Sequence, residues 1–328
     1  MYMIITQKQL DKTLKELDVI IRIYKKRYSK KEKRDWRTYE QMLAKRIKTA
    51  AREIKPVIEE AYSLIEIKKR RGRKPKIDVT QKVLLLLLKE IFQLSNRRMA
   101  NLLAFFSVLT GIDISYKTVE RCYSEEPVRL TIRNMFIILT KKKGIDNVDT
   151  CGDGTGYSLT ITKHYRNERE KELKGKKVKK KFVYTFALMD LDTKMYIGYG
   201  VSMKSEKEAF ENAKAMAIDM GINVKSVRLD KHYSYRSIVN EFGKAKIYIL
   251  PKRNATIKGS AKWKKILKEL IDSPYSFLKE YYKRNNSESG FSTDKRLCGW
   301  KVWQRREDRI NIALMCRGLW HNLLLMGT

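Results

Sequence analysis

The spacing of apolar residues divides the chain into a helical first part and a mixed second part. From Leu10 to Tyr24, apolar residues recur at intervals of three or four, which is typical of an amphipathic helix. The polar run SKKEKRD follows, and a second helical stretch runs from about Trp36 to Lys69, with an interruption expected at Pro56. These patterns predict a basic helical hairpin over residues 1–70.

Three shorter helices are predicted between residues 78 and 125, because Asp78, Ser95 and Ser115 each stand where a helix N-cap would. The last two, joined by TGIDIS, have the length and pattern of a helix-turn-helix, in which early residues of the second helix reach DNA bases. A small helical bundle without this role is the alternative. We predict a helix-turn-helix DNA-binding domain over residues 71–143. Its expected DNA-contacting residues are Tyr116, Lys117, Thr118 and Arg121.

From about Asn147 the pattern changes to short runs typical of strands. VDTCGDGTG predicts a short strand ending in a turn, YSLTITKHY a second strand, and residues 181–203 a β-hairpin with its turn near residues 190–193. A helix, a strand, a helix and a strand follow, and most of the chain from Trp263 onward reads as helical. This order predicts an α/β fold: a ribonuclease-H-like mixed sheet with flanking helices over residues 144–328, preceded by an all-α N-terminal part. A doubly wound nucleotide-binding fold fits less well, because GDGTG lacks the G-x-G-x-x-G spacing and a Walker lysine.

The charge of the chain adds a strong expectation about its partner. Its 328 residues include 72 Lys and Arg against 37 Asp and Glu, a net charge of +35. Such a surplus favours a polyanion, because each phosphate that Lys or Arg neutralises releases bound counterions. Double-stranded DNA is the expected partner, and an RNA-binding basic protein is the alternative.

The most basic stretch is KKRRGRKPK, residues 68–76. It resembles the Arg-Gly-Arg-Pro core of minor-groove AT-hook arms, although Lys74 separates Arg73 from Pro75. We expect Arg71, Arg73 and Lys74 to contact DNA. A basic linker that touches phosphates without sequence preference is the alternative.

No signal peptide or membrane span is expected. The apolar run Val83–Leu88 is far too short to cross a bilayer, and the start of the chain has only a brief apolar run. The four cysteines are scattered without a C-x-x-C pair, which indicates neither a disulfide framework nor a zinc site. A reducing, cytoplasmic location is expected.

Two acidic residues stand at the ends of predicted strands. Asp153 follows the first strand, and Asp230 ends the later strand SVRLD. Carboxylates at the ends of adjacent strands converge, and their repulsion requires a cation. Two Mg²⁺ or Mn²⁺ ions are the usual solution in phosphoryl transfer, where one activates the attacking oxygen and the other stabilises the leaving oxygen. Asp149 is the rival for the first position.

A third acid is expected from a helix, and Glu288 is the candidate. Tyr281, Arg284, Glu288 and Lys295 follow the spacing Y-x2-R-x3-E-x6-K, which would place the last three on one helical face. Gly290 weakens the helix prediction there. Glu280 and Asp294 are nearby acids that do not fit this spacing, and a surface helix with an i,i+4 ion pair is the alternative to a metal site.

These residues resemble the Y-R-E-K signature of insertion-sequence transposases of bacteria and archaea, over roughly residues 147–328. The D-x-T-G segment beginning at Asp153 and the tyrosine-containing turn after Asp230 are also similar to that family. The resemblance implies a ribonuclease-H-like core in which Asp153, Asp230 and Glu288 bind two Mg²⁺ or Mn²⁺ ions. It also implies that Tyr281, Arg284 and Lys295 contact DNA phosphates near the transposon end.

The activity implied is metal-dependent cleavage at the 3′ ends of an insertion sequence, followed by strand transfer into target DNA. The resemblance further implies that the N-terminal domain recognises terminal repeats, that a homodimer forms on DNA, and that the protein is associated with the nucleoid. A ribonuclease-H-like nuclease without strand transfer and a non-catalytic, transposase-derived DNA-binding protein are the alternatives.

One feature departs from part of the family. Some members carry a large β-rich insertion between the second Asp and the Glu, whereas here only residues 231–287 intervene. We therefore expect a catalytic domain without a large insertion. The base-handling residues of those members cannot be carried over to this chain, and excision through a hairpin or through another pathway stays open.

Histidines and tryptophans contribute less to the expected site. His232 could assist near Asp230, while a structural role fits it equally well, and His321 is expected on the surface or in the core. Trp300, Trp303 and Trp320 are expected in the core.

Overall fold

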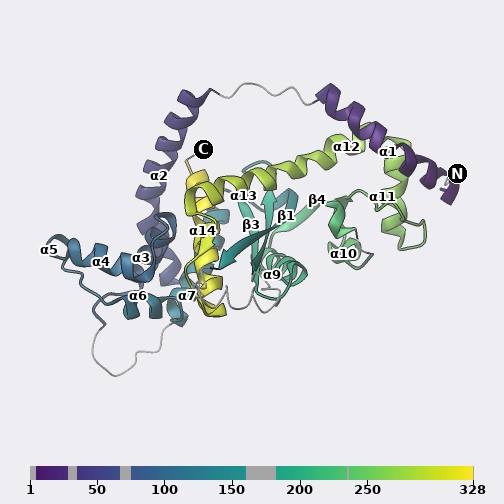
Figure 1. Cartoon of the computed structure of the whole chain (residues 1–328). Coiled ribbons are helices and arrows are strands. Elements are labelled where there is room, and N and C mark those ends of the chain that lie inside the picture. Colours follow the sequence, from purple (N-terminus) through teal and green to yellow (C-terminus); the bar gives the residue numbers. More distant parts are fainter. Residues whose placement is uncertain (1–4, 29–34, 67–74, 160–181, 235, 328) are drawn as a thin grey trace, which may run out of the picture.

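The computed structural model describes residues 5–28, 35–66, 75–159, 182–234 and 236–327 (Figure 1). The chain begins with α1 (Gln7–Tyr28) and α2 (Trp36–Ser63), as the apolar spacing predicts. Helix α2 continues through Pro56, so the predicted interruption is wrong. Buried Ile54, Val57 and Ile58 lie on either side of this proline, and α2 packs against other helices there, which offsets the backbone hydrogen bond that proline lacks.

The hairpin expected for residues 1–70 is not how these helices pack. Helix α1 contacts α11 (Ala261–Asp272) and α12 (Pro274–Tyr281), whereas α2 packs against α3, α7 and α14 (Figure 1). The apolar face of α1 buries Leu10, Leu17 and Tyr24, and the Tyr24 ring stacks on Tyr282 with centroids 5.2 Å apart. Apolar periodicity predicted the buried face but not the partner that covers it.

The predicted helix starts between residues 78 and 125 are confirmed. Asp78 accepts a hydrogen bond from the Gln81 amide at the start of α3 (Val79–Ile91). Ser95 and Ser115 cap α4 (Asn96–Phe105) and α6 (Tyr116–Cys122) in the same way. A single turn, α5 (Ser107–Thr110), lies in the connection, and α7 (Glu126–Lys142) leads to the sheet.

A mixed sheet forms the centre of the second part, in the order β3-β2-β1-β4-β5, with β6 pairing along β1. Strands β2 and β3 are antiparallel to their neighbours, whereas β4, β5 and β6 run parallel to theirs. This order and the flanking helices confirm the ribonuclease-H-like fold. The strands are β1 (Asn147–Leu159), β2 (Phe182–Asp190), β3 (Tyr196–Ser202), β4 (Asn223–Leu229), β5 (Lys246–Tyr248) and β6 (Lys301–Val302).

Strand β1 differs from the prediction. It is one strand of 13 residues, so Asp153 lies within it and not in a turn after it, and Tyr157 to Leu159 continue it instead of starting a second strand. Residues 150–158 pair with β2, and residues 147–152 pair with β4 on the other edge. The ladder hydrogen bonds keep this Gly-rich segment extended, which overrides its turn-like composition.

Helices cover both faces of the sheet. Helix α9 (Glu206–Asp219) packs on β2 and β3 so closely that a Cβ atom at Gly200 would lie 1.9 Å from the Ala209 carbonyl oxygen. Helices α13 (Asn285–Cys298) and α14 (Glu307–Leu325) cover the opposite face. Gly290 does not break α13; a side chain there would collide with Met189 and Tyr196, so its absence lets the helix approach the sheet.

Short elements connect Asp230 to α13. They are η1 (Lys231–Tyr233), α10 (Arg236–Glu241), β5, α11, α12 and η2 (Tyr282–Arg284). Trp320 is buried in α14 as expected, but Trp300 is 63% exposed and Trp303 38% exposed, so their predicted core position is wrong. They flank β6 in an extended segment, because this part of the chain extends the sheet instead of continuing a helix.

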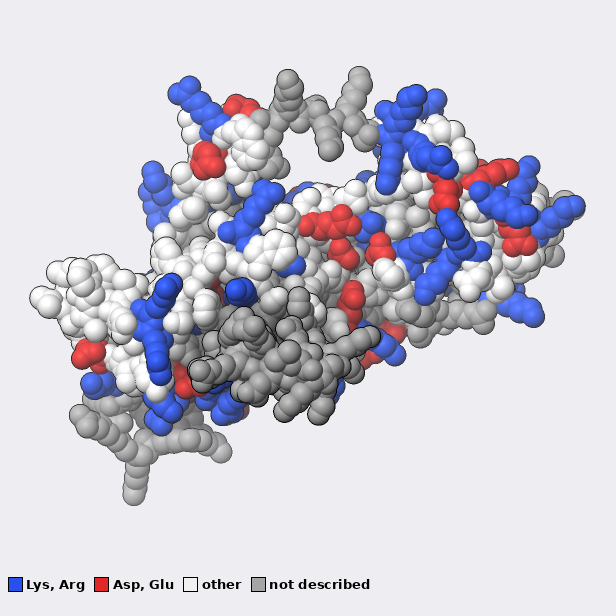
Figure 2. All heavy atoms as spheres, in the orientation of Figure 1, with Lys and Arg blue, Asp and Glu red and all other residues white. Residues whose placement is uncertain are grey.

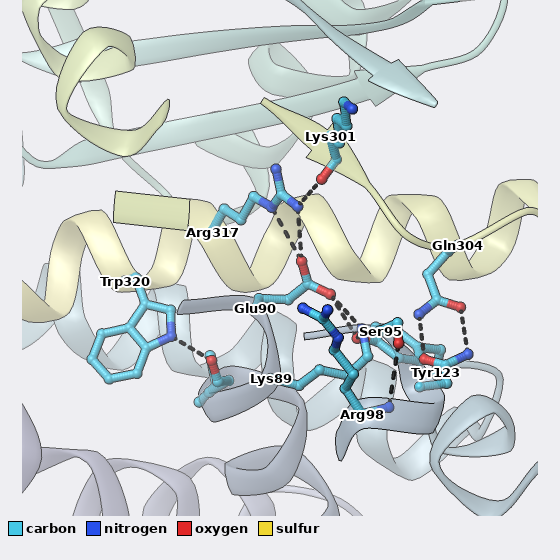
Figure 3. Close-up of polar contacts among 11 residues, drawn as sticks. Lys89, Glu90, Ser95, Arg98, Tyr123, Lys301, Gln304, Arg317 and Trp320 are labelled. Carbon is cyan, nitrogen blue, oxygen red and sulfur yellow. Dashed lines mark hydrogen bonds and ion pairs between the residues drawn. The ribbon is translucent and has the colours of Figure 1, made fainter. Parts of the chain in front are cut away.

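A buried polar cluster joins the N-terminal helices to α14 (Figure 3). The Glu90 carboxylate accepts hydrogen bonds from Arg317 Nε and Nη2, both at 3.1 Å, and from the Tyr123 hydroxyl at 2.7 Å. Lys89 Nζ lies 3.2 Å from the same carboxylate, and all four side chains are buried. Nearby, the Trp320 indole donates to the Leu87 carbonyl. The cluster connects α3 and the end of α6 to α14, and so joins the N-terminal helices to the part of the chain that contains the sheet.

No helix in the described ranges is long and apolar enough to cross a membrane.

Replacing Glu90 with alanine should leave Arg317 and Lys89 buried without a counter-charge. We expect the free energy of unfolding, measured by urea denaturation, to fall by about 3–5 kcal/mol. Glu59→Ala removes an exposed partner of Lys55 and should change it by less than about 0.5 kcal/mol. If both variants changed the free energy of unfolding equally, the buried cluster would contribute no more to stability than an exposed ion pair.

Candidate active site

The site is built on the middle of β1. Asp153 pairs with Ala187 of β2, and its Oδ1 accepts a hydrogen bond from the Gly154 amide at 2.9 Å. A Cβ atom at Gly154 would point toward Glu206 of α9, so by strand alternation Asp153 points to the opposite face, where α13 lies. The pairing of Asp153 with β2, directly after the end of the β4 ladder, therefore fixes the direction of this carboxylate.

Asp230 follows β4 directly, next to Asp153. Gly152 is paired with Leu229 in the parallel β1–β4 ladder, and the next residue of each strand is Asp153 and Asp230. The Asp230 side chain also caps η1 by accepting a hydrogen bond from the His232 amide at 2.9 Å. The His232 side chain itself is exposed. Strand pairing thus brings together two carboxylates that are far apart in the sequence.

Glu288 comes from the first turn of α13 and completes the group. Arg284 Nη1 lies 2.6 Å from Glu288 Oε1 and 3.3 Å from Asp230 Oδ2, so one guanidinium bridges the two acids. The pKa of Asp153 is raised to about 6. Burial is the largest cause, and the charges of Glu288 and Asp230 add to it, while the Gly154 amide and Arg284 act in the opposite direction. The three carboxylates predicted from the sequence therefore share one electrostatic environment.

The rival acids have other partners. Asp149 accepts a hydrogen bond from Ser226 and lies 3.7 Å from Arg228 Nη1. Glu280 is paired with the same Arg228 and with Lys283. Asp294 is buried between His321 and the Tyr196 hydroxyl, 2.8 Å and 2.7 Å away, which also places His321 in the core.

The other Y-R-E-K residues surround the triad, but they are less exposed than phosphate contacts would suggest. Tyr281 is buried, and the Arg284 guanidinium lies over its ring, 5.4 Å from the centroid. Lys295 Nζ donates to the Thr155 hydroxyl at 2.5 Å and lies over the rings of Tyr157 and Trp300. Burial lowers the pKa of Lys295. Arg284 therefore contacts Glu288 and Tyr281, whereas Lys295 contacts Thr155, two residues along β1 from Asp153.

A hydrogen bond between Tyr233 and Glu206, close to the three acids, was not predicted from the sequence. The Tyr233 hydroxyl donates to Glu206 in the first turn of α9. Burial raises the pKa of Tyr233, and the charges of Glu206, Asp153 and Asp230 raise it further. The tyrosine in the turn after Asp230 was visible in the sequence, but only the approach of α9 to the sheet reveals its partner.

The donor set suits a hard divalent cation, since carboxylate oxygens are the ligands that Mg²⁺ and Mn²⁺ prefer. The Arg284 guanidinium that bridges Asp230 and Glu288 offsets part of the repulsion between these carboxylates, as a bound cation would. Within the described ranges, however, no three His, Cys, Asp or Glu side chains are grouped closely enough to hold a metal ion as they stand. The triad would have to close around a metal.

The residues predicted to contact DNA in the N-terminal part are accessible where they can be described. Tyr116, Lys117 and Arg121 are exposed on α6, whereas Thr118 is half-buried beside the Ser115 cap. Arg97 lies over the Tyr116 ring at 5.2 Å. Three further predicted contacts, in the basic segment, fall outside the described residues: Arg71, Arg73 and Lys74.

Basic side chains border the acidic site. Figure 2 shows Lys and Arg gathered over α1, α11 and α12, next to a smaller group of acidic side chains near the start of α13. The lysines of these three helices that are exposed or half-buried include Lys25, Lys26, Lys262, Lys264, Lys265, Lys268 and Lys279.

Comparison with known proteins gives one strong similarity. The chain is 44% identical over 309 residues to a probable transposase for insertion sequence element ISA1214 from Archaeoglobus fulgidus. The aligned region covers 94% of this chain and 93% of that protein. No protein-family model matches the chain.

The raised pKa of Asp153 predicts a pH-dependent penalty. Between about pH 4 and 6 the folded protein keeps a proton that the unfolded chain, with its usual pKa of 3.8, has released, so stability falls as pH rises through this window. In EDTA at about pH 8, Asp153→Asn should therefore be more stable than wild type by about 1–3 kcal/mol in urea denaturation, with no gain near pH 4. Asp149→Asn, which loses an ion pair, should not be stabilised. A gain for Asp153→Asn that does not vary with pH would contradict this account.

Proposed function

Because the chain belongs to the insertion-sequence transposases, and so is a DNA-processing enzyme, we propose that Asp153, Asp230 and Glu288 form its metal-dependent catalytic centre. The observation that carries this proposal is the convergence of the three acids, from β1, the end of β4 and the start of α13, around one guanidinium. The Asp-Asp-Glu residues of the family resemblance are the three acids that meet here.

In this proposal the carboxylates hold two Mg²⁺ or Mn²⁺ ions, which would activate the attacking oxygen and stabilise the leaving oxygen of a phosphodiester. Strand β1 orients Asp153, and η1 orients Asp230 through the His232 amide. Lys295 of α13 contacts Thr155, which lies on β1 two residues from Asp153. In this proposal Lys295 would pair with a DNA phosphate close to the acids. The reaction would be cleavage at the 3′ ends of the element and strand transfer into target DNA.

The basic surface accounts for the remaining DNA contacts. Cations on α1, α11 and α12 would neutralise phosphates near the site without reading sequence. The exposed start of α6 would read the terminal repeats, with Arg71, Arg73 and Lys74 as a flanking arm. Because two element ends must be held together, the DNA complex would contain a homodimer.

Replacing any one of the three acids with alanine should abolish the metal site. We expect each variant to lose at least about 1,000-fold in cleavage of DNA carrying the element's own ends, with Mg²⁺ or Mn²⁺, because metal stabilisation of the transition state contributes several kcal/mol. Asp149→Ala, the rival on the same strand, should retain activity. Full activity of Asp153→Ala, Asp230→Ala or Glu288→Ala would refute the assignment. A joining assay with pre-cut 3′-hydroxyl ends distinguishes a transposase from a nuclease, which would cut without joining.

Reading by α6 predicts a sequence-dependent loss. Arg121→Ala should weaken binding to the terminal repeat by about 1–3 kcal/mol in fluorescence anisotropy at fixed salt, and should affect unrelated DNA much less. Arg129→Ala, an exposed arginine on α7, serves as the matched control. If Arg121→Ala weakened both DNAs equally, Arg121 would be a phosphate contact only.

A further inference from the structure

Arg284 occupies an unusual place for a residue expected to contact DNA. Its Nη1 reaches both Glu288 and Asp230, and only 16% of its side chain is exposed. Although burial opposes its charge, Tyr281, Asp230 and Glu288 raise the pKa of Arg284. The guanidinium therefore lies among the catalytic acids and not on the outer surface.

The contact is favourable in charge but incomplete in geometry. An arginine binds a carboxylate best through two parallel N–H groups, whereas here a single nitrogen serves two carboxylates. Arg284 Nε is buried and has no hydrogen-bond partner among the described residues. Arg284 also stands in η2, the short turn that links α12 to α13, and not inside a long helix. Arg284 therefore pairs with two acids through Nη1 while its Nε–H group lacks a hydrogen-bond acceptor among the described residues.

We propose that Arg284 is an exchangeable internal cation: it neutralises the triad in the metal-free protein and leaves the acids when metal binds. This inference rests on the proposed metal site. Three carboxylates gathered on one sheet face repel each other, and the guanidinium offsets part of that repulsion. A metal ligated by Asp230 and Glu288 needs the carboxylate oxygens that Arg284 now occupies, so the two cations compete.

Release gives the guanidinium a second role. Its fork of N–H groups matches a phosphate better than it matches the present contact. Metal loading would therefore free one strong phosphate-binding group beside the acids. In this way the occupancy of the metal site and the grip on DNA become linked through a single side chain.

Competition predicts that removing Arg284 strengthens metal binding. Full-length Arg284→Gln should bind Mn²⁺ roughly 3- to 10-fold more tightly than wild type, the range for a lost charge-assisted pair that is partly exposed. The free Mn²⁺ signal in electron paramagnetic resonance measures this directly. Arg284→Lys, which keeps a cation, should stay close to wild type. Arg133→Gln, which breaks an exposed ion pair with Asp219, should not change the affinity.

If Arg284 instead positioned the acids for metal binding, its removal would have the opposite effect on Mn²⁺ affinity. If Arg284 only ordered the acids for metal, Arg284→Gln would bind Mn²⁺ equally or more weakly, and the exchange would be overturned. Arg284→Met, which keeps more apolar volume over the Tyr281 ring, replaces the glutamine variant if that one does not fold. The wild-type and Asp153→Asn proteins distinguish the two proposals. No Mn²⁺ binding by wild type, or unchanged binding by Asp153→Asn, refutes the metal site itself.

Release has its own readout in DNA binding. Mn²⁺ should strengthen binding of wild type to DNA severalfold more than it strengthens binding of Arg284→Gln, in fluorescence anisotropy at constant ionic strength. Equal strengthening of both proteins would show that the guanidinium is not transferred to a phosphate.

Discussion

Strand β1 is hydrogen-bonded to neighbouring strands on both of its edges, and the arrangement of the three acids depends on this pairing. The antiparallel ladder to β2 and the parallel ladder to β4 keep residues of β1 extended despite three glycines between Cys151 and Tyr157. The ladder to β4 sets Asp230 beside Asp153. Helix α13 can then approach the same face closely because Gly290 leaves room for Met189 and Tyr196. The three acids meet because these backbone contacts leave them little freedom.

Charge is distributed unevenly over this frame. In a chain with a net charge of +35, one group of acids lies near the start of α13, with Lys and Arg of α1, α11 and α12 next to it (Figure 2). A basic surround attracts a polyanion, while the acids repel it unless cations lie between them. Arg284 supplies one such charge within the protein, and the proposed metal ions would supply more. Repulsion between the clustered carboxylates thus contributes to the raised pKa of Asp153 and favours a cation at the site. The same carboxylates would repel a polyanion unless such a cation were present.

The N-terminal helices and the part of the chain that contains the sheet are joined through buried contacts. Glu90 and Arg317 pair across the boundary, and Asn96 and Gln304 exchange amide hydrogen bonds nearby (Figure 3). Elsewhere, α1 packs against α11 and α12, and its Tyr24 stacks on Tyr282, two residues before Arg284. Elements from the first 130 residues therefore contact the second part of the chain at two separate places.

Local sequence determined most of the elements. Apolar periodicity and N-cap residues located the helices that begin after Asp78, Ser95 and Ser115, and alternation located the β2–β3 hairpin, because these signals act within a few residues. The four-residue spacing likewise brought Arg284 into contact with Glu288.

Tertiary structure decided the features that depend on distant partners. The strand state of the Gly-rich segment around Asp153 came from its ladder to β2, next to the end of the β4 ladder, and the position of α1 came from its packing on α11 and α12. Trp300 and Trp303 became exposed because the chain there extends the sheet. The place of Arg284 between two acids, and that of Glu206 against Tyr233, arose from the meeting of elements far apart in the chain. The spacing of residues along the chain determines which face of a helix or strand a side chain lies on. The residues that pack against that face come from distant parts of the chain, so they are decided only by the tertiary structure.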